Sequence, residues 1–166
     1  RSVDHCTRLC HASSVAALLE GVGSGAVSNP VRDVDQADLI IVIGSNPTVN
    51  HPVAATWMKN AAQRGARIVM MDPRRTDLAR HAWRTVQFKP DTDVALLNAM
   101  LHTILEEGLH DPDFIRTRTE DFDALQRHVQ AFSPEHMAEH CGVAASTIRE
   151  VARAYAQADA AMILWG

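Results

Sequence analysis

Hydrophobic positions in this chain form short, uninterrupted runs that alternate with stretches of helical spacing. The strongest run is Leu39–Ile43, read as LIIVI, in which no polar residue separates the apolar ones. A run without alternation is typical of a strand buried on both faces of a parallel sheet. Further strands are expected at 66–71, 85–88 and 162–164, which are short runs rich in apolar or β-branched residues.

Helical spacing covers most of the remaining chain. Asp91 or Thr92 is expected to cap a long helix, and the spacing of its apolar residues predicts which side faces the core. That predicted stripe consists of Val94, Leu97, Leu101, Ile104 and Leu105. Other helices or helical turns are expected at 13–19, 31–37, 52–64, 76–81 (capped by Thr76), from Asp111-Pro112, at 119–129, from Ser133-Pro134, and over Ile148, Val151, Ala152 and Tyr155.

The alternation of strands and helices predicts an α/β fold, a three-layer α/β/α arrangement around a parallel, Rossmann-like sheet. A length of 166 residues corresponds to about one domain, so we interpret 1–166 as a single α/β domain. Within it, 1–30 contain an N-terminal segment with reactive side chains and a Gly-rich loop, and 111–157 form a helical insertion before the last strand.

Composition narrows the functional classes. The net charge of −4 offers no broad basic field for nucleic acid, and no apolar run reaches transmembrane length. Three cysteines argue against a disulfide framework, and Cys141 is expected to be a packed thiol. Because the chain starts with Arg1 and ends in a strand-like AMILWG, we expect a piece of a longer protein. The cellular compartment therefore cannot be inferred from the lack of a targeting segment in this piece.

Polar loops follow three of the expected strands. They read GSNP at 44–47, DPRR at 72–75 and KPDTD at 89–93. The carboxyl ends of parallel strands share one edge, where open α/β sheets bind ligands. Carboxylates there can accept from ribose or guanine, helix N-termini attract phosphate, and Arg74 and Arg75 can pair with a pyrophosphate. The competing interpretation is that these polar residues only cap helices and form turns.

The N-terminal segment RSVDHCTRLCH carries four reactive side chains, His5, Cys6, Cys10 and His11. One hypothesis is a zinc site, although C-x3-C is not the usual spacing. A second is a reactive or metal-binding Cys thiolate with His11 as its proton partner. A third is structural: Cys6 and Cys10 are buried one helical turn apart and the histidines are exposed.

A family resemblance favours the second hypothesis. The segment Ser2–Ala12, SVDHCTRLCHA, resembles the active-site segment of formate dehydrogenase catalytic (alpha) subunits, which belong to the dimethyl sulfoxide reductase family of molybdopterin oxidoreductases. The similarity continues through GSGAVSN, GSNPTVNHP, MDPRRTDLARHA, KPDTDVALLNAM and ILWG, and it covers essentially the whole chain.

The resemblance implies roles for two neighbouring residues. Cys10 matches the cysteine or selenocysteine that ligates molybdenum or tungsten, and His11 matches the histidine that handles the proton of formate. A soft thiolate suits such a metal, and His titrates near neutral pH. Related nitrate reductases typically carry Met after the cysteine, so His11 favours formate oxidation over a nitrate reductase.

The resemblance also implies a bis-molybdopterin guanine dinucleotide cofactor containing Mo or W. The residues implied to line the site of one of its dinucleotide halves are Gly44, Ser45, Asn46, His51, Asp72, Pro73, Arg74, Asp91 and Asp93. Family members further have a 4Fe-4S cluster in an N-terminal region, an arginine beyond position 166 that helps to hold formate, and a C-terminal domain. The alternative for this piece alone is an inactive apo domain without cofactor.

The remaining expectations concern partners. The full enzyme is expected to be a cytoplasmic oxidoreductase that passes the electrons of formate to electron-transfer subunits, such as NAD-linked ones. An oligomer is compatible with this organisation, whereas nucleic acid and a membrane span are not expected.

Overall fold

The computed structural model describes residues 3–4, 6–27 and 29–166. The chain divides into two compact units, Arg1–Pro30 and Val31–Gly166. The predicted domain organisation, with 1–166 as a single domain, stays a prediction. No helix among the described residues is both long enough and apolar enough to cross a membrane.

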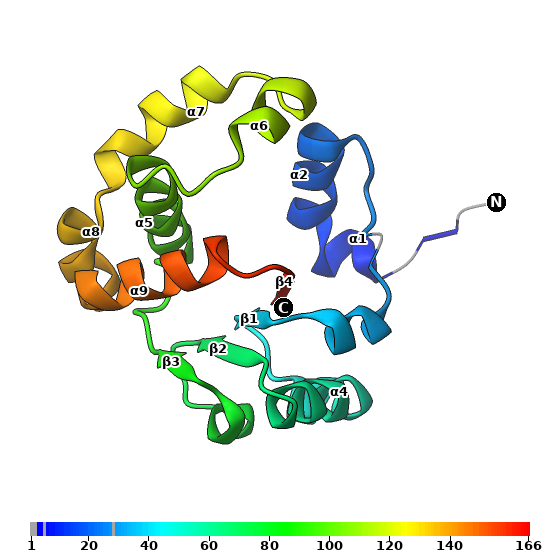
Figure 1. The fold of residues 1–166 in the computed structure, drawn as a ribbon. Helices are drawn as coiled ribbons and strands as arrows, with labels where there is room; N and C mark the ends of the chain where they lie inside the picture. Colours follow the sequence, from blue (N-terminus) through cyan, green and yellow to red (C-terminus); the bar gives the residue numbers. More distant parts are fainter. Residues whose placement is uncertain (1–2, 5, 28) are drawn as a thin grey trace. The chain divides into compact units, whose positions relative to one another are not determined.

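The larger unit is built on a four-stranded parallel sheet in the order β3-β2-β1-β4 (Figure 1). Its strands are β1 (Leu39–Ile43), β2 (Arg67–Met71), β3 (Arg84–Val86) and β4 (Ala161–Trp165). The central β1 places Ile41 beside Val69 of β2 and Ile163 of β4. The predicted parallel α/β sheet is therefore confirmed, although β3 ends at Val86 and leaves Phe88, expected in the strand, buried beyond it.

The β1 run lacks alternation because both faces of the strand are covered. Leu39, Ile41 and Ile43 belong to one apolar cluster, and Ile40 and Val42 belong to another. All five residues are buried. The two clusters confirm the expected three layers, with the sheet in the middle.

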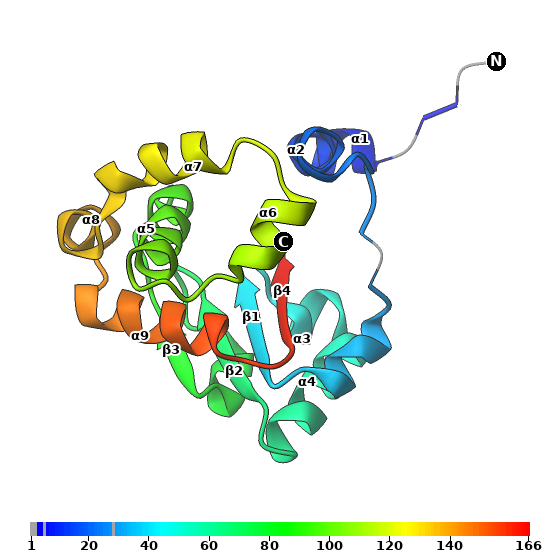
Figure 2. The ribbon, with the colours of Figure 1, turned by 45° about the horizontal axis from the view of Figure 1, so that its top comes forward.

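Different helices cover the two faces, as Figure 2 shows for α9 and α4. The helical members of the first cluster come from α5 (Asp93–Glu106), α8 (Pro134–Cys141) and α9 (Ala145–Ala156). Those of the second come from η1 (Val31–Gln36), α4 (Pro52–Gln63) and η2 (Asp77–His81), the η elements being 3-10 helices. The remaining elements of this unit are α3 (Pro47–Asn50), α6 (Pro112–Arg118), α7 (Phe122–Val129) and η3 (Gln130–Phe132).

The buried side of α5 differs from the predicted one. Val94 is 69% exposed and Leu97 is 38% exposed, although both were expected in the core. The buried residues of the helix are Leu96, Ala99, Met100 and Thr103. Ile104 packs against the core as predicted, whereas the prediction was wrong for Val94 and Leu97. Helix α5 is apolar around most of its circumference, so its own spacing does not select one face.

Two of the predicted helix caps form and two do not. The Asp111 carboxylate accepts from the N–H groups of Asp113 and Phe114, and the Ser133 hydroxyl accepts from the His136 N–H group, as expected. Thr92 and Thr76 occupy N-cap positions but accept no such bond. Thr92 instead donates its hydroxyl to the Lys89 carbonyl at 2.7 Å. Likewise, α7 starts at Phe122 rather than at Thr119, after Asp121 with φ of 56°.

Three helices on one face of the sheet are joined by an ionic network centred on Arg149 of α9. Its guanidinium donates to both carboxylate oxygens of Glu135 on α8, each at 2.9 Å, and to Glu106 on α5 at 2.7 Å. The bond from Arg149 lowers the pKa of Glu135 to about 2. Glu107, paired mainly with Arg153, also has a lowered pKa. Both carboxylates are therefore ionised throughout the neutral range.

The smaller unit contains α1 (Thr7–Cys10) and α2 (Ala12–Val22). No residue of either helix is buried. Helix α2 confirms the helix predicted at 13–19 and extends it at both ends.

Candidate functional site

The predicted loops lie at one edge of the sheet. Because β1, β2 and β3 run parallel, the segments that follow Ile43, Met71 and Val86 all leave from their carboxyl ends. We call this edge the rim. The structure thus brings GSNP, DPRR and KPDTD to a common side of the sheet, as the sequence predicted.

The loop after β1 presents free main-chain donors. Gly44 has φ of +60°, and its N–H group donates to the Met71 carbonyl at 2.9 Å. The next two N–H groups, of Ser45 and Asn46, donate to no described residue. A side chain at position 44 would meet nothing within 4 Å, so the rim is open at this point. Successive free N–H groups after a left-handed residue form a concave site for an anion such as a phosphate.

The last residue of the chain adjoins this loop. The Gly166 N–H group donates to the Ile43 carbonyl at 3.2 Å. A Cβ atom at position 166 would lie 2.4 Å from the Gly44 carbonyl oxygen, so the close approach requires glycine.

The loop after β2 holds a buried carboxylate. The Asp72 side chain is only 6% exposed, and its Oδ1 accepts from the Arg74 N–H group at 2.7 Å. The Arg74 guanidinium lies 3.7 Å from the same oxygen and is largely exposed. The other oxygen, Oδ2, accepts from no residue in the part of the chain described. A carboxylate held in this way fits a ligand that donates, such as a ribose hydroxyl or a guanine amino group.

The loop after β3 is held in place by contacts with α8. The Lys89 side chain donates to the Glu139 carbonyl at 2.7 Å, and the buried Cys141 thiol lies 3.7 Å from the Thr92 carbonyl. Asp91, with φ of 66°, and Asp93, the first residue of α5, are both exposed in this loop region. The Cys141 thiol is packed as predicted, and burial raises its pKa.

His51 follows the loop after β1 and lies between two helices. It ends α3 and precedes Pro52 of α4, and its carbonyl accepts from the Ala55 N–H group at 2.9 Å. Its side chain is exposed. The short helix α3 was not predicted, because GSNPT reads as a plain turn.

The sequence did not predict the environment of the Thr76 side chain, which lies next to the rim. The Thr76 hydroxyl, expected to cap a helix, is buried and has no hydrogen-bond partner. It follows Asp72-Pro73-Arg74-Arg75 directly. A buried hydroxyl left open beside the rim is a further group able to bind a polar ligand, and only the structure reveals that its partner is missing.

Cys10 and His11 lie in the smaller unit. Cys10 is the last residue of α1 and is exposed, and His11 lies between α1 and α2. Cys6 is also exposed, so the hypothesis that both thiols are buried core residues was wrong. His5 lies outside the described residues. Among the described residues, no three His, Cys, Asp or Glu side chains gather as a metal-ligand group.

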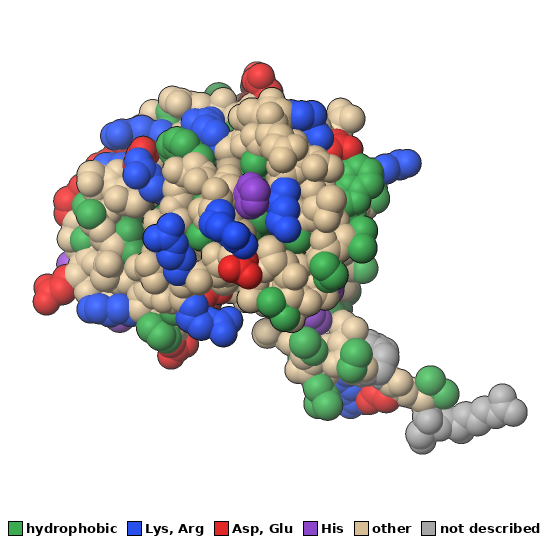
Figure 3. Space-filling model, turned by 90° about the horizontal axis from the view of Figure 1, so that it is seen from below, with side chains coloured by type: hydrophobic (Ala, Val, Ile, Leu, Met, Phe, Trp, Pro, Cys, Tyr) green, Lys and Arg blue, Asp and Glu red, His purple; other side chains and the backbone are tan. Residues whose placement is uncertain are grey.

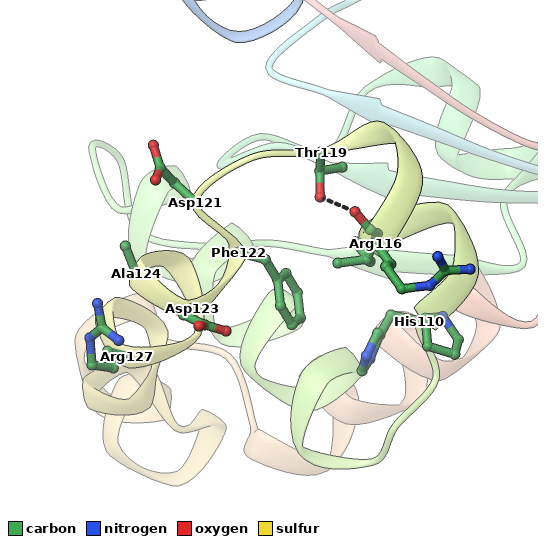
Figure 4. Close-up of a pocket in the computed structure, with 10 residues that line it drawn as sticks. His110, Arg116, Thr119, Asp121, Phe122, Asp123, Ala124 and Arg127 are labelled. Atoms are coloured by element: carbon green, nitrogen blue, oxygen red, sulfur yellow. Dashed lines mark hydrogen bonds between the residues drawn. The ribbon is translucent and has the colours of Figure 1, made fainter.

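A separate pocket of about 580 Å³ lies between α6 and α7 (Figure 4). Phe122 lies at its centre beside His110, with the two ring centroids 5.4 Å apart, and Arg116 and Arg127 lie on opposite sides. The Thr119 hydroxyl, also in its wall, already donates to the Ile115 carbonyl at 2.7 Å. None of the predicted site residues lines this pocket, so it is distinct from the rim.

The chain is similar to known proteins along nearly its whole length. The family model described as molybdopterin oxidoreductase matches residues 1–166. The chain is 45% identical over 165 residues to formate dehydrogenase H of Escherichia coli (strain K12), covering 99% of this chain and 23% of that protein. It is 40% identical over 164 residues to the F420-dependent formate dehydrogenase subunit alpha of Methanocaldococcus jannaschii, covering 99% of this chain and 24% of that protein.

A solved structure shows the same fold. Acetylene hydratase from Pelobacter acetylenicus superposes with a TM-score of 0.75 at 28% identity, covering 82% of this chain and 20% of that one. The chain therefore spans about a quarter or less of the length of these relatives.

Proposed function

Because this chain belongs to the molybdopterin oxidoreductase family, we propose that it is the part of a formate dehydrogenase catalytic subunit that binds one half of a bis-molybdopterin guanine dinucleotide and supplies a ligand to its Mo or W. The observation that carries the proposal is the 45% identity to formate dehydrogenase H along nearly the whole chain. The free donors and acceptors of the rim support it independently.

In this proposal the rim holds the dinucleotide. The Ser45 and Asn46 N–H groups bind phosphate oxygens, and Asp72 accepts from the guanine or ribose through its free oxygen. Arg74 pairs with phosphate, while Gly44 keeps the loop open. Pro73, His51, Asp91 and Asp93 line the same site.

Cys10 and His11 carry the chemistry in this proposal. When bound, the cofactor accepts the two electrons released as formate becomes carbon dioxide. The Cys10 thiolate ligates the metal, and the imidazole of His11 takes up the proton that formate loses. A 4Fe-4S cluster outside this chain would supply the path for the electrons to electron-transfer subunits, which we propose to be NAD-linked and cytoplasmic.

Substitutions in the full-length protein test the proposal. Cys10→Ala is expected to abolish formate oxidation, whereas Cys6→Ala, which removes another exposed thiol one helical turn away, is expected to retain it. His11→Gln is expected to slow turnover while Mo or W content, measured by elemental analysis, stays unchanged. Full turnover by Cys10→Ala, or reduction of nitrate in place of formate oxidation by the unaltered protein, would refute the assignment.

Elemental analysis of the 166-residue chain addresses the apo alternative. Stoichiometric Mo or W would show that this part retains the cofactor alone, and absence of Mo, W, Fe and Zn would identify an apo domain. Stoichiometric zinc would contradict the proposal and support a zinc site at His5–His11.

A further inference from the structure

Positive charge is concentrated in one stretch of the chain. Residues 64–84, from the end of α4 to the start of β3, contain six arginines and two aspartates. This stretch carries a formal charge of +4, whereas the whole chain carries −4, so the remaining residues carry −8. The η2 segment lies at the lower side of the molecule in Figure 1, and Figure 3 views that side, with Lys and Arg side chains gathered around a histidine.

Within this stretch, two arginines share one aromatic ring. The guanidinium carbon of Arg67 lies 5.2 Å from the centre of the Trp83 ring, and that of Arg84 lies 5.5 Å from it. Both distances are typical of cation–π contacts. Trp83 is nevertheless 38% exposed, which is unusual for the largest side chain in proteins.

The charges of this cluster are only partly neutralised. Arg84 is paired with Glu150, yet its Nε is buried without a hydrogen-bond partner. Arg67 has no carboxylate partner in the described part of the chain, and its guanidinium lies against the Trp83 ring instead. Arg80 reaches Asp77 at 3.7 Å and is 75% exposed, and His81 beside it is exposed too. We call Arg67, Arg80, His81, Trp83 and Arg84 the Trp83 patch.

The Trp83 patch is separate from the rim. Arg67 is the first residue of β2 and Arg84 is the first residue of β3. The Trp83 N–H group donates to the Ile68 carbonyl at 2.8 Å, which fixes the tryptophan at the amino ends of these strands. A five-residue strand is about 16 Å long, so the patch and the predicted cofactor loops lie at opposite edges of the sheet.

We propose that the Trp83 patch is a docking surface for an acidic face of a partner protein. Tryptophan and arginine are the residues most enriched among those that dominate protein–protein binding energy. The cation–π contact with Trp83 restricts the Arg67 guanidinium before binding, so less side-chain freedom is lost when a carboxylate arrives. An acidic protein surface supplies that carboxylate, and the partner's apolar atoms cover the exposed part of the Trp83 ring.

The charge distribution favours a protein over nucleic acid. A phosphate polymer is attracted by an extended basic surface, and the acidic remainder of this chain works against such attraction. A local patch of four or five groups around an aromatic centre instead matches the core of a small protein interface.

Fluorescence anisotropy with a labelled poly-L-glutamate of about 20 residues tests the proposal on the 166-residue chain. Binding at 50 mM NaCl is expected to weaken at 300 mM, because the attraction is electrostatic. Arg67→Glu with Arg80→Glu is expected to weaken binding by about tenfold or more. Trp83→Ala and the charge-conserving Arg67→Lys are expected to weaken it by smaller factors, since each changes the cation–π contact of the patch.

The matched control is Arg118→Glu with Arg127→Glu, the same change of charge on two exposed arginines of α6 and α7. Binding by this control is expected to stay within about twofold of the unaltered chain. Circular dichroism and the thermal midpoint identify any variant that fails to fold, and Arg67→Lys then replaces it in the comparison.

Three results would overturn the proposal. They are no binding of the acidic polypeptide at 50 mM NaCl, equal weakening by the control pair, and tighter patch-dependent binding of a 20-nucleotide single strand or of anionic lipid vesicles. In the full-length protein, the patch variants are expected to retain formate oxidation with an artificial electron acceptor. Failure of the docking proposal is thereby distinguished from failure of the proposed function.

Discussion

Replacing Arg149 with methionine is expected to destabilise the larger unit. Arg149 of α9 is the only described residue that pairs with both α5 and α8, through Glu106, Glu107 and Glu135. Methionine retains most of the aliphatic stem, so the substitution removes charge and hydrogen bonds rather than packing. Three carboxylates then lose the cation that holds them together.

The expected loss is about 1.5 kcal/mol at pH 7. An exposed ion pair contributes about 0.2–1 kcal/mol. The Arg149 side chain is only 19% exposed and binds Glu135 with two parallel hydrogen bonds, which places this pair above that range. Because Glu135 is 59% exposed, solvent screening keeps the figure well below that of a buried pair. For a chain of this size the thermal midpoint is expected to fall by about 3–6 °C.

Urea unfolding followed by circular dichroism measures this difference at several pH values. The folded-state pKa of Glu135 is about 2, below its ordinary value of 4.5. The stabilisation by Glu135 is therefore fully present above about pH 4.5 and is lost as the pH falls toward 2. The difference in unfolding free energy between the unaltered chain and Arg149→Met should be constant from pH 7 to pH 5 and should decrease below pH 4.5.

Arg127→Met is the control, because Arg127 is an exposed arginine of α7 with no ion pair among the described residues, and its stability should change by less than about 0.5 kcal/mol. Equal stability of Arg149→Met and the unaltered chain at pH 7 would refute the reasoning. A loss that stays the same down to pH 3 would show that packing, and not the pairing with Glu135, is responsible.

Two further predictions concern the support of the rim. Gly142→Ala is expected to lower the free energy of unfolding, measured in urea, by about 1–2 kcal/mol, because Gly142 has φ of +71° and its new Cβ would lie 3.2 Å from the Lys89 side chain. The control Gly21→Ala lies in a helix with open space around it and should be neutral or stabilising. A larger loss of stability in Gly21→Ala than in Gly142→Ala would contradict this account. Iodoacetamide at pH 8 should modify Cys6 and Cys10 rapidly and Cys141 only after denaturation, because burial both shields the Cys141 thiol and raises its pKa; mass spectrometry showing three modified cysteines in the native chain would refute this.

The elements that the sequence predicted correctly are those whose composition is compatible with only one structural environment. The LIIVI run has no polar face, so it fits only a strand covered on both sides, and the predicted loops after three parallel strands had to share an edge. Asp111-Pro112 and Ser133-Pro134 start helices because cap and proline act within a single turn. These predictions depend on neighbours along the chain, which a sequence displays directly.

Features that depend on distant residues were not predictable. The face of α5 is chosen by α8 and α9, so Val94 was wrongly assigned to the core. The partners of Arg149 lie 14 to 43 positions away, and the Arg67–Trp83 cation–π contact depends on the register of β2 and β3. The roles of Cys10, His11 and the rim residues rest on resemblance and remain predictions for the experiments above.

The order of the strands also determines when the sheet can be completed. Strand β4 pairs with β1, and the contact that joins their starts connects Asp38 with Ala160, 122 positions apart. During synthesis β1 and β2 emerge early, yet one edge of β1 stays unpaired until α5 to α9 have been made and β4 follows them. An unpaired apolar strand edge readily joins edges of other chains. Folding of this unit is therefore expected to be slow and prone to aggregation until β4 is added, and chaperones that shield β1 should raise the yield of native protein.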